Sequence, residues 1–432
     1  MTVVDGVGAR DMGLEQRREL QEQRLCGLVD RLLAAGGIQA RWLRDCGVRG
    51  GRDVRLGDLH RLPTVGKRDL WEHYPYGLRA VEADDVVCVH GSSGTGGRPT
   101  LVPYTAHDLD VWAEVAARAL AGAGVTRQSV VHNAYGYGLF TGGLGVHHGA
   151  TRLGAAVVPV SGGMTERQVR LIQDLRPDVL TCTPSFALHL GEAMSAAGVV
   201  PTSLRVGVFG AEPWTHEMRV QVENLLGIRA LDIYGLTEII GPGVACESFE
   251  SDGMLDIAED HFYPECLDSD GNPVPDGTPG ELVFTTLTKT GMPLLRYRTG
   301  DVAALSTPVS GQWRRMTKVL GRTDDMVVIR GVNVFPTEVE AVLLADGRVS
   351  PHYLVVEDRR QPARPELRVA VETATADVPR LIDDLRGALR ERLGLTCDVR
   401  VVAAGAVPRV EVGKTQRLVR WVSGEAPVAG LE

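Results

Sequence analysis

The stretch Val206–Glu238, VGVFGAEPWTHEMRVQVENLLGIRALDIYGLTE, decides the fold of this chain. Two short apolar runs within it, Val206–Gly210 and Ala230–Tyr234, are rich in Val, Ile and Leu and end in turn residues, which is typical of buried strands. Between them, His216–Leu226 has the pattern of a helix. Because a helix that connects two such strands places them parallel in one sheet, the stretch predicts a strand–helix–strand crossover.

The same alternation continues on both sides, from about residue 86 to residue 295. Ala155–Val160 and Val179–Cys182 are two further expected strands, with an expected helix at Thr165–Leu175 between them. Leucines at helical spacing before Gly36 predict an N-terminal helix, and Asp268–Glu281, which is dense in Gly, Pro and Asp, predicts turns. We therefore predict an α/β fold whose large N-terminal domain contains parallel-rich sheets and helices.

The character of the sequence changes after Arg322, where a small α+β domain is expected. We predict residues 1–322 as the large domain and residues 323–432 as the small one. The expected strands and helices of the small domain are Met326–Ile329, Pro336–Ala345, Tyr353–Val356, Leu367–Val371, Val378–Leu393 and Val399–Val402. The last of these is predicted to be the final strand, and residues 424–430 a loose tail. The acidic residues of this domain are interpreted as a solvated helix face: Glu338, Glu340, Asp383 and Asp384.

Composition excludes several classes of protein. The chain has 432 residues, of which 44% are apolar and 23% charged, so it is neither disordered nor fibrous. Its formal charge of -9 argues against nucleic acid or an anionic membrane as the main partner. We find no apolar run of about 18 residues and no signal-peptide pattern. The seven scattered cysteines favour free thiols in a reducing cytoplasm, which is the expected location.

A loop of small residues, His90–Thr100 (HGSSGTGGRPT), follows the apolar run Val86–Val89. Backbone amides, hydroxyls and a cation are the groups that a triphosphate needs. The Walker pattern G-x-x-x-x-G-K-[ST] does not fit, because Gly97 and Arg98 stand where Lys and Ser or Thr are required. Taken alone, the loop indicates either a phosphate site or a plain flexible turn.

Further motifs follow this loop in a fixed order: DIYGLTE at Asp232–Glu238, RYRTGD at Arg296–Asp301, GRTDDM at Gly321–Met326, RGVNVFP at Arg330–Pro336, and Gly413-Lys414. Together with the loop, they resemble the motifs of the adenylate-forming superfamily. Three further motifs resemble those of the phenylacetate–CoA ligase branch: NAYGYGLFTGG at Asn133–Gly143, GAEPW at Gly210–Trp214 and EDHFYPE at Glu259–Glu265. The resemblance covers about residues 14–420.

The resemblance implies a ligase that uses ATP, Mg²⁺ and CoA, in a large adenylate-forming domain with a small mobile C-terminal domain. A carboxylate is a poor acyl donor because its leaving group is oxide. Attack on the α-phosphate of ATP releases pyrophosphate and gives an acyl-adenylate, from which the CoA thiol displaces AMP. Because the first step brings two anions together, it needs cations and amide donors, and Mg²⁺ to neutralise the triphosphate.

The resemblance also implies a role for each motif residue. The β- and γ-phosphates are assigned to Ser92, Ser93, Gly94, Thr95 and Arg98. The adenine is assigned to Gly210, Ala211, Glu212, Asp232 and Tyr234, and the ribose hydroxyls to Asp301. Catalytic roles fall to Thr237 at the α-phosphate, Glu238 at Mg²⁺, Arg322 at the ribose or phosphate, and Lys414 between the carboxylate and the α-phosphate. Asp324 matches the hinge between the domains, and Gly331 is expected near the entering thiol of CoA.

The aromatic residues of the NAYGYGLFTGG motif allow two interpretations. In this branch they line the acyl pocket, so an aromatic ring is expected against Tyr135, Tyr137 and Phe140, with Gly142 leaving room beside it. The alternative is that they are core aromatics. The neighbouring pair His147-His148 fits substrate contact and ordinary packing equally well.

Two features depart from the pattern of the family. In the phosphate loop, Gly96 replaces the usual second Thr and Arg98 the usual Lys, which keeps the charge but changes its shape. Some family members bind a structural metal, and Cys246, His261 and Cys266 offer partial ligands. We interpret these three as a core thiol, a loop histidine and a chance cysteine.

Three functions follow from these observations. The leading one is an aryl-acid–CoA ligase. The second is an adenylating enzyme of natural-product assembly that acts on a hydroxy- or aminobenzoate and transfers it to a carrier-protein thiol or an amine. The third is a nucleotide- or acyl-binding protein without turnover, which only Gly96 and Arg98 support. The sequence predicts no nucleic-acid or membrane partner and leaves a homodimer open.

Overall fold

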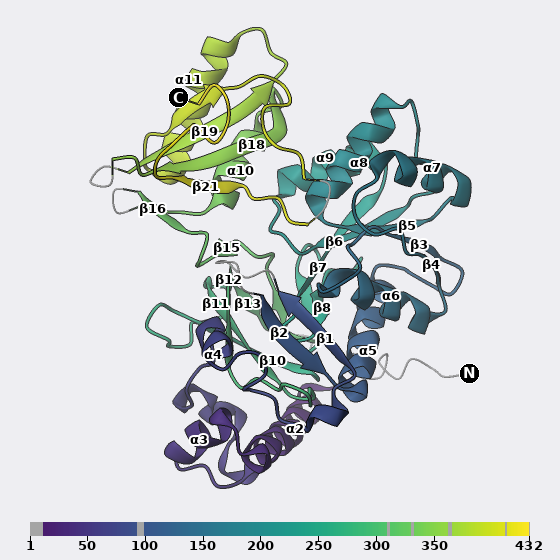
Figure 1. Cartoon of the computed structure of the whole chain (residues 1–432), viewed down its shortest axis with the longest axis vertical. Coiled ribbons are helices and arrows are strands. Elements are labelled where there is room, and N and C mark those ends of the chain that lie inside the picture. The colour runs from purple at the N-terminus through teal and green to yellow at the C-terminus, as the bar shows by residue number, and fades with distance from the viewer. Residues whose placement is uncertain are drawn as a thin grey trace.

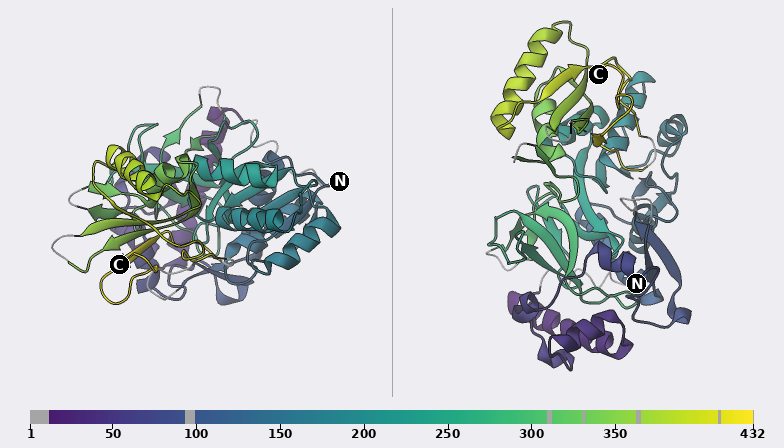
Figure 2. Two further views of the ribbon diagram at one scale, coloured as in Figure 1. Left: turned by 90° about the horizontal axis from the view of Figure 1, so that it is seen from above. Right: turned by 60° about the vertical axis from the view of Figure 1, so that its left-hand side comes forward.

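The computed structural model describes residues 12–92, 99–308, 312–329, 332–361, 365–410 and 413–431 (Figure 1). A larger N-terminal body carries a smaller C-terminal domain. In the views of Figures 1 and 2, this domain lies at the end of the body where helices α8 (Pro184–Ala196) and α9 (His216–Leu226) are found.

A nine-stranded sheet forms the centre of the N-terminal body. Its strand order is β13-β14-β9-β8-β7-β6-β5-β3-β4. The parallel strands are β3 (Val130–Asn133), β4 (Ala156–Val158), β5 (Val179–Cys182), β6 (Val206–Gly210) and β7 (Arg229–Leu236). The antiparallel side consists of β8 (Gly241–Cys246), β9 (Leu255–Ile257), β13 (Leu305–Ser306) and β14 (Arg315–Met316). The crossover predicted from Val206–Glu238 is therefore confirmed.

Helices cover both faces of this sheet because successive strand residues point to opposite faces. In β6, Val208 packs with α5 (Ala106–Gly122) and α6 (Thr141–Leu153). The next residue, Phe209, packs on the other face with α7 (Thr165–Leu175), α8 and α9. Because strands β3 to β7 run parallel, their carboxyl ends lie at one edge of the sheet, where ligands bind in open α/β sheets.

The rest of the body surrounds this core. A second, antiparallel sheet contains β10 (Phe262–Leu267), β11 (Gly280–Thr286), β12 (Tyr297–Ala303) and β15 (Gly321–Arg322), and β1 (Cys88–Ser92) pairs with β2 (Thr100–Tyr104). The N-terminal helices are α2 (Leu14–Ala35), α3 (Ile38–Asp45) and α4 (Lys67–Glu72), with short 3-10 turns at Gly51–Asp53, Leu56–Arg61 and Ala83–Asp85. Among the helices that the structure describes, none combines the length and the apolar character that crossing a bilayer requires.

The C-terminal domain starts with the hairpin β16 (Val327–Ile329) and β17 (Val332–Val334), followed by α10 (Pro336–Ala345). Its four-stranded sheet has the order β20-β19-β18-β21, with β18 (Val349–Asp358), β19 (Glu366–Thr373), β20 (Asp398–Val401) and β21 (Leu418–Trp421). Helix α11 (Val378–Leu393) buries its leucine stripe against this sheet. The prediction of a larger α/β domain followed by a smaller α+β one is confirmed.

Three expectations for this domain are wrong. The final strand is β21, which pairs in parallel with β18, and not Val399–Val402. The segment 424–430 is not loose, because Val428 is buried against Trp421. Glu340 does not lie on a solvated face, since its side chain is only 3% exposed. In each case the burial comes from packing against a distant element, which local composition does not reveal.

Candidate active site

The predicted phosphate end of the site lies where strands β1 and β7 end. Ser92 is the last residue of β1, and its hydroxyl donates to the carboxylate of Glu238 at 2.7 Å. Thr237 places its hydroxyl 3.4 Å from the carbonyl oxygen of Gly91 and 3.3 Å from the hydroxyl of Thr141. Thr237 and Glu238 are both buried. The structure thus brings predicted residues from two distant motifs into contact.

Two buried residues that the sequence did not single out support this turn. The Tyr104 hydroxyl donates to the carbonyl oxygen of Thr237 at 2.8 Å. The Lys289 ammonium donates to the carbonyl oxygen of Glu238 at 2.9 Å and lies 4.8 Å from the centre of the Tyr104 ring. Lys289 occurs in the polar run TLTKTG, whose spacing carries no sign of burial. Its contact with Glu238 depends on the packing of two distant segments, so the local sequence does not predict it.

The burial of Lys289 predicts a pH dependence of stability. Loss of water lowers the pKa of Lys289 to about 8, although Asp108 and Glu238 act in the opposite direction. Between this pKa and the usual lysine value, the unfolded chain binds a proton that the folded chain does not, so stability rises with pH. Relative to Lys289→Met, the wild type should gain about 1–2 kcal/mol between pH 8 and about pH 9.5.

Thermal melting of both proteins across this pH range measures the difference. Tyrosines and other titrating groups are common to both proteins, so their contributions cancel in the comparison. A gap that stays constant with pH would mean that Lys289 keeps its proton in the folded protein.

The predicted ribose end lies on the second sheet. Asp301 on β12 stands opposite Arg322 on β15, and the Arg322 guanidinium donates to one Asp301 oxygen. The Tyr234 hydroxyl, from the central sheet, donates to the other oxygen at 2.7 Å. Burial raises the pKa of Asp301, and Arg322 opposes that effect. Because each carboxylate oxygen accepts two hydrogen bonds, the carboxylate is held in place and can still receive two hydroxyls.

The predicted adenine residues lie at the adjacent ends of β6 and β7. Asp232 is buried and accepts a hydrogen bond from the Trp214 indole at 2.9 Å, and burial raises its pKa to about 6. A side chain at Gly210 would meet the carbonyl oxygen of Ile233 at 2.0 Å, so only glycine fits there. The next residue, Ala211, has φ 74°, a left-handed conformation that costs a non-glycine residue about 1–2 kcal/mol. Strain of this kind is typical of functional sites.

Glu212 links the two domains. One of its carboxylate oxygens accepts from the backbone amide of Ser185 at 2.7 Å, at the start of α8. The other accepts from the amide of Thr415 at 2.9 Å, in the C-terminal domain. Glu212 was predicted at the adenine, and the structure adds a direct bond to the residue that follows Lys414.

The side chain of Lys414 is solvent-exposed, and the charges of four predicted site residues act on it. Loss of water lowers its pKa most, followed by the positive charge of Arg322. Asp301, Glu238 and Glu212 oppose both effects. The hydrogen bond from the next residue, Thr415, to Glu212 is the contact that holds this lysine beside the body.

The aromatic residues expected at the acyl pocket occupy three different environments. Tyr135 is buried in the core cluster that includes α5 and α6, with its ring against Gly142. The Tyr137 hydroxyl accepts from the Asn133 amide at 2.7 Å and lies 3.1 Å from His147 Nδ1, and burial raises its pKa to about 12. Phe140 is 53% exposed at the start of α6. Of the three, only Phe140 offers most of its ring to solvent.

Some predicted site residues lie outside the described parts of the chain, and their roles stay predictions. These are Ser93, Gly94, Thr95, Arg98 and Gly331, together with the departure at Gly96.

The cysteine and histidine residues considered as metal ligands have separate partners. Cys246 Sγ lies 3.2 Å from the carbonyl oxygen of Glu247, and Cys266 Sγ lies 3.3 Å from that of Ala303. His261 Nδ1 lies 2.8 Å from the Thr288 hydroxyl. Within the residues that the structure describes, no group of three or more His, Cys, Asp or Glu side chains could hold a metal ion.

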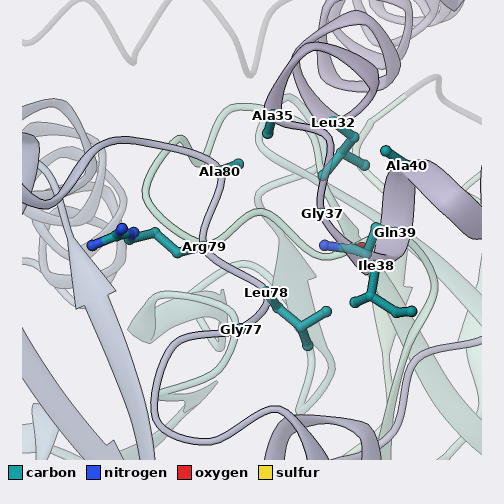
Figure 3. A pocket seen from close by; sticks show the side chains of 10 residues that line it. All are labelled: Leu32, Ala35, Gly37, Ile38, Gln39, Ala40, Gly77, Leu78, Arg79 and Ala80. Atoms are coloured by element: carbon teal, nitrogen blue, oxygen red, sulfur yellow. The ribbon is translucent and has the colours of Figure 1, made fainter.

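A small pocket lies between the end of α2 and the start of α3 (Figure 3). Leu32, Ile38, Gln39 and Leu78 are among the residues that line it. Gln39 already bonds the carbonyl oxygen of Pro293 at 2.8 Å and the amide of Leu295 at 3.2 Å. Its amide group is therefore used to join segments, and the pocket contains none of the predicted site residues.

The predicted hinge residue, Asp324, lies in a turn that follows β15. The amides of Asp325 and Met326 both donate to the carbonyl oxygen of Arg322, at 3.2 and 3.1 Å. The Asp324 carboxylate lies 3.5 Å from the Arg322 guanidinium.

Proline at position 324 should separate the two half-reactions. Because proline fixes φ near -65°, Asp324→Pro should prevent the turn from changing shape when the domain rotates. We expect pyrophosphate release to persist and thioester production to fall about tenfold or more. Asp324→Ala is the matched control, since it removes the same carboxylate without fixing the backbone. A Pro variant with normal thioester yield would exclude the hinge role.

Comparison with known proteins identifies the family of this chain. The AMP-binding enzyme family matches residues 40–288, and the AMP-binding enzyme C-terminal domain matches residues 331–420. The chain is 50% identical over 430 residues to the phenylacetate-coenzyme A ligase of Thermus thermophilus, which covers 94% of this chain and 96% of that protein. It is 44% identical over 415 residues to that of Escherichia coli strain K12, which covers 94% and 95%.

Solved structures of one related ligase in two states match this chain to different degrees. A 2-hydroxyisobutyryl-CoA ligase in the postadenylation state, with R3-HIB-AMP, matches with TM-score 0.88 and 26% identity over 95% of this chain and 90% of its own. The same ligase in the thioesterification state, with 2-HIB-AMP and CoA, matches with TM-score 0.70 at 26% identity over 95% and 91%. Identity and coverage are nearly equal in the two comparisons, so this chain superposes better on the postadenylation structure than on the thioesterification structure of that ligase.

The predicted fold class and family are thus confirmed by the coverage and identity of these relatives. The chain belongs to the AMP-binding, adenylate-forming enzyme family and, within it, to the phenylacetate–CoA ligase branch, as an AMP-forming acid–CoA ligase.

Proposed function

We propose that this chain joins an aromatic carboxylic acid to CoA, with ATP and Mg²⁺, through an acyl-adenylate. The observation that carries the proposal is the hydrogen bond from the Thr415 amide to Glu212 at 2.9 Å, which brings Lys414 of the C-terminal domain to the body residues Glu238, Asp301 and Arg322, whose charges act on it. These residues come from separate motifs: Glu238 follows β7 of the central sheet, and Asp301 and Arg322 lie on β12 and β15 of the second sheet. The relatives named phenylacetate-coenzyme A ligase support an arylacetate-type acid as the substrate.

The first half-reaction needs positive charge between two anions. Lys414 is suited to bridge the acid and the α-phosphate, because its ammonium is a compact donor on a flexible stem. The phosphates of ATP would raise its pKa against the effects of lost water and Arg322. Thr237 would donate a hydrogen bond to the α-phosphate, and Asp301 would receive the ribose hydroxyls.

The donor set beside Thr237 fits Mg²⁺. Glu238 provides a buried carboxylate, and the Ser92 hydroxyl lies 2.7 Å from it, so the available ligands are hard oxygens. Glu238 would hold the ion while the phosphates of ATP complete its coordination. When bound, Mg²⁺ supplies charge neutralisation at the triphosphate. Tyr104 and Lys289 hold the two backbone carbonyls of this turn, so the carboxylate and the Thr237 hydroxyl start from fixed positions.

A panel of acids tests the proposal. Phenylacetate, benzoates with hydroxyl or amino substituents, and acetate are incubated with ATP and Mg²⁺, with and without CoA, and AMP, pyrophosphate and thioester are measured. We expect pyrophosphate from an aryl acid without CoA, and thioester plus AMP when CoA is added. Aryl adenylation without any transfer to CoA would contradict the proposal and favour a carrier-protein thiol or an amine as acceptor.

A further inference from the structure

Two carboxylates, the buried Glu340 and the partly buried Glu212, cross the domain interface in opposite directions. Glu340, on α10 of the C-terminal domain, accepts a hydrogen bond from the backbone amide of Thr215 in the body at 3.0 Å. Glu212, in the body, accepts one from the backbone amide of Thr415 in the C-terminal domain at 2.9 Å. Each domain therefore presents a side-chain anion to the main chain of the other.

The carboxylate of Glu340 has polar partners within its own domain. It also accepts a hydrogen bond from the Tyr353 hydroxyl, and Arg417 Nε lies 3.9 Å from its carboxylate. The Arg417 guanidinium lies 4.5 Å from the centre of the Tyr353 ring. A buried charge requires such partners, so the carboxylate is fixed in the C-terminal domain before it reaches across.

The recipient of this carboxylate is the start of a helix. Thr215 is the N-cap of α9, and its hydroxyl accepts from the amide of Met218 at 3.3 Å. The amides at a helix N-terminus lack partners inside the helix, and the helix dipole favours an anion there. Glu340 thus provides, from another domain, the anion that this end of α9 favours.

Other contacts place this bond inside a packed interface. Leu344, one turn further along α10, is buried in the core cluster formed by α7, α8 and α9. His352 Nε2 lies 3.0 Å from the carboxylate of Glu192 on α8. The polar bond is therefore protected from water on the side where the domains touch, which strengthens it.

We propose that Glu340 is a positioning residue for adenylate formation, whose bond to the Thr215 amide holds the C-terminal domain where Lys414 can act. Glu212 is its counterpart, because it bonds the residue directly after Lys414 and so fixes the backbone of that lysine. The inference rests on the proposed function, in which Lys414 serves only the first half-reaction. Rotation to the thioester-forming arrangement breaks these bonds.

Variants on opposite sides of the interface test this role. Thr215→Pro removes the amide donor, and the φ of -87° at this position is close to the range of proline. Thr215→Ala loses the same hydroxyl but keeps the amide, so it is the matched reference. In the C-terminal domain, Glu340→Gln removes the charge, and Glu338→Gln is its control because Glu338 bonds the Phe335 amide of its own domain at 3.3 Å.

Two half-reactions are measured separately: pyrophosphate release without CoA, and thioester formation from supplied acyl-adenylate and CoA. We expect Thr215→Pro and Glu340→Gln to slow the first about tenfold relative to their controls, the order for a hydrogen bond to a charged group. The second should be unchanged or faster. The double variant should be no slower than the worse single one, because Thr215→Pro removes the bond and Glu340→Gln weakens the same bond by removing its charge.

The outcomes separate this inference from the proposed function. Additive losses, equal losses in both half-reactions, or unimpaired adenylation in Thr215→Pro would overturn the positioning role. If Lys414→Ala itself leaves adenylation intact, the proposed function is wrong, and the positioning role falls with it. If Lys414→Ala is impaired while the Thr215 and Glu340 variants are not, only the positioning role is wrong. Thr215→Pro decides the matter if Glu340→Gln fails to fold.

Discussion

Replacing Lys414 by alanine is expected to lower the rate of adenylate formation by about 10²–10³-fold, the range found on losing one electrostatic contact to a transition state. The reason is that the first step joins a carboxylate to a triphosphate, and Lys414 is the only lysine in residues 323–432. Thioester formation from supplied acyl-adenylate should survive, because that step has no second anion to bridge. Separate assays of the two half-reactions measure the split.

Lys414→Arg is the informative companion variant. It keeps the charge, but its planar guanidinium is larger and donates in a fixed fork, so it should restore adenylation only in part. A variant in which both half-reactions fall by the same factor would contradict the assignment of Lys414 to adenylation alone.

The second large effect concerns the choice of acid. An aryl acid should be preferred over acetate by at least about 10²-fold in kcat/KM, which corresponds to about 2.7 kcal/mol. Burying an aromatic ring removes roughly 150–250 Å² from water, and stacking adds about 0.5–1.5 kcal/mol. Phe140 and its neighbour Leu139 are 53% and 43% exposed, so they offer apolar surface that a substrate ring could cover. Measured kcat/KM values for both acids test the ratio.

Phe140→Ala should reduce that preference by removing the exposed ring. Phe249→Ala is a matched control, since Phe249 is also exposed, at 42%, but lies after β8 and packs against Arg229. Equal activity on acetate and on every aryl acid would show that the aromatic residues do not form the acyl pocket.

The contacts of Tyr137 limit which ring substituents it could recognise. Asn133 Nδ2 donates to the Tyr137 hydroxyl and also to the carbonyl oxygen of Gly143, and Asn133 Oδ1 accepts from Thr181. The orientation of the Asn133 amide is therefore fixed, and the Tyr137 hydroxyl lies 3.1 Å from His147 Nδ1, where the histidine tautomer decides which group donates. In the tautomer with Nδ1 unprotonated, the phenol donates to His147 and retains only acceptor capacity, so it would favour a substrate group that donates, such as a ring hydroxyl or amine.

Much of this protein follows from local sequence. The strands Val179–Cys182 and Val206–Gly210 and the helices His216–Leu226 and Val378–Leu393 have the bounds that periodicity predicts. These elements are short-range features, since hydrophobic spacing and turn residues are enough to define them. The motifs from the phosphate loop to Lys414 also indicate the family, because they are stretches of local sequence that need no tertiary contact to be recognised.

The sequence by itself therefore determined the fold class and the family, and it predicts the residues that carry the chemistry. Only the tertiary structure decided how the site is held together. Lys289 bonds the carbonyl oxygen of Glu238, 51 positions away. Glu340 bonds the amide of Thr215, 125 positions away, and Glu212 bonds the amide of Thr415, 203 positions away. The tertiary structure also decided which arrangement the domains adopt. The physical reason is that burial of a charge depends on which distant surface packs over it, and neither composition nor periodicity records that surface. For this reason Glu340 has the sequence pattern of a solvated residue and the environment of an interface carboxylate.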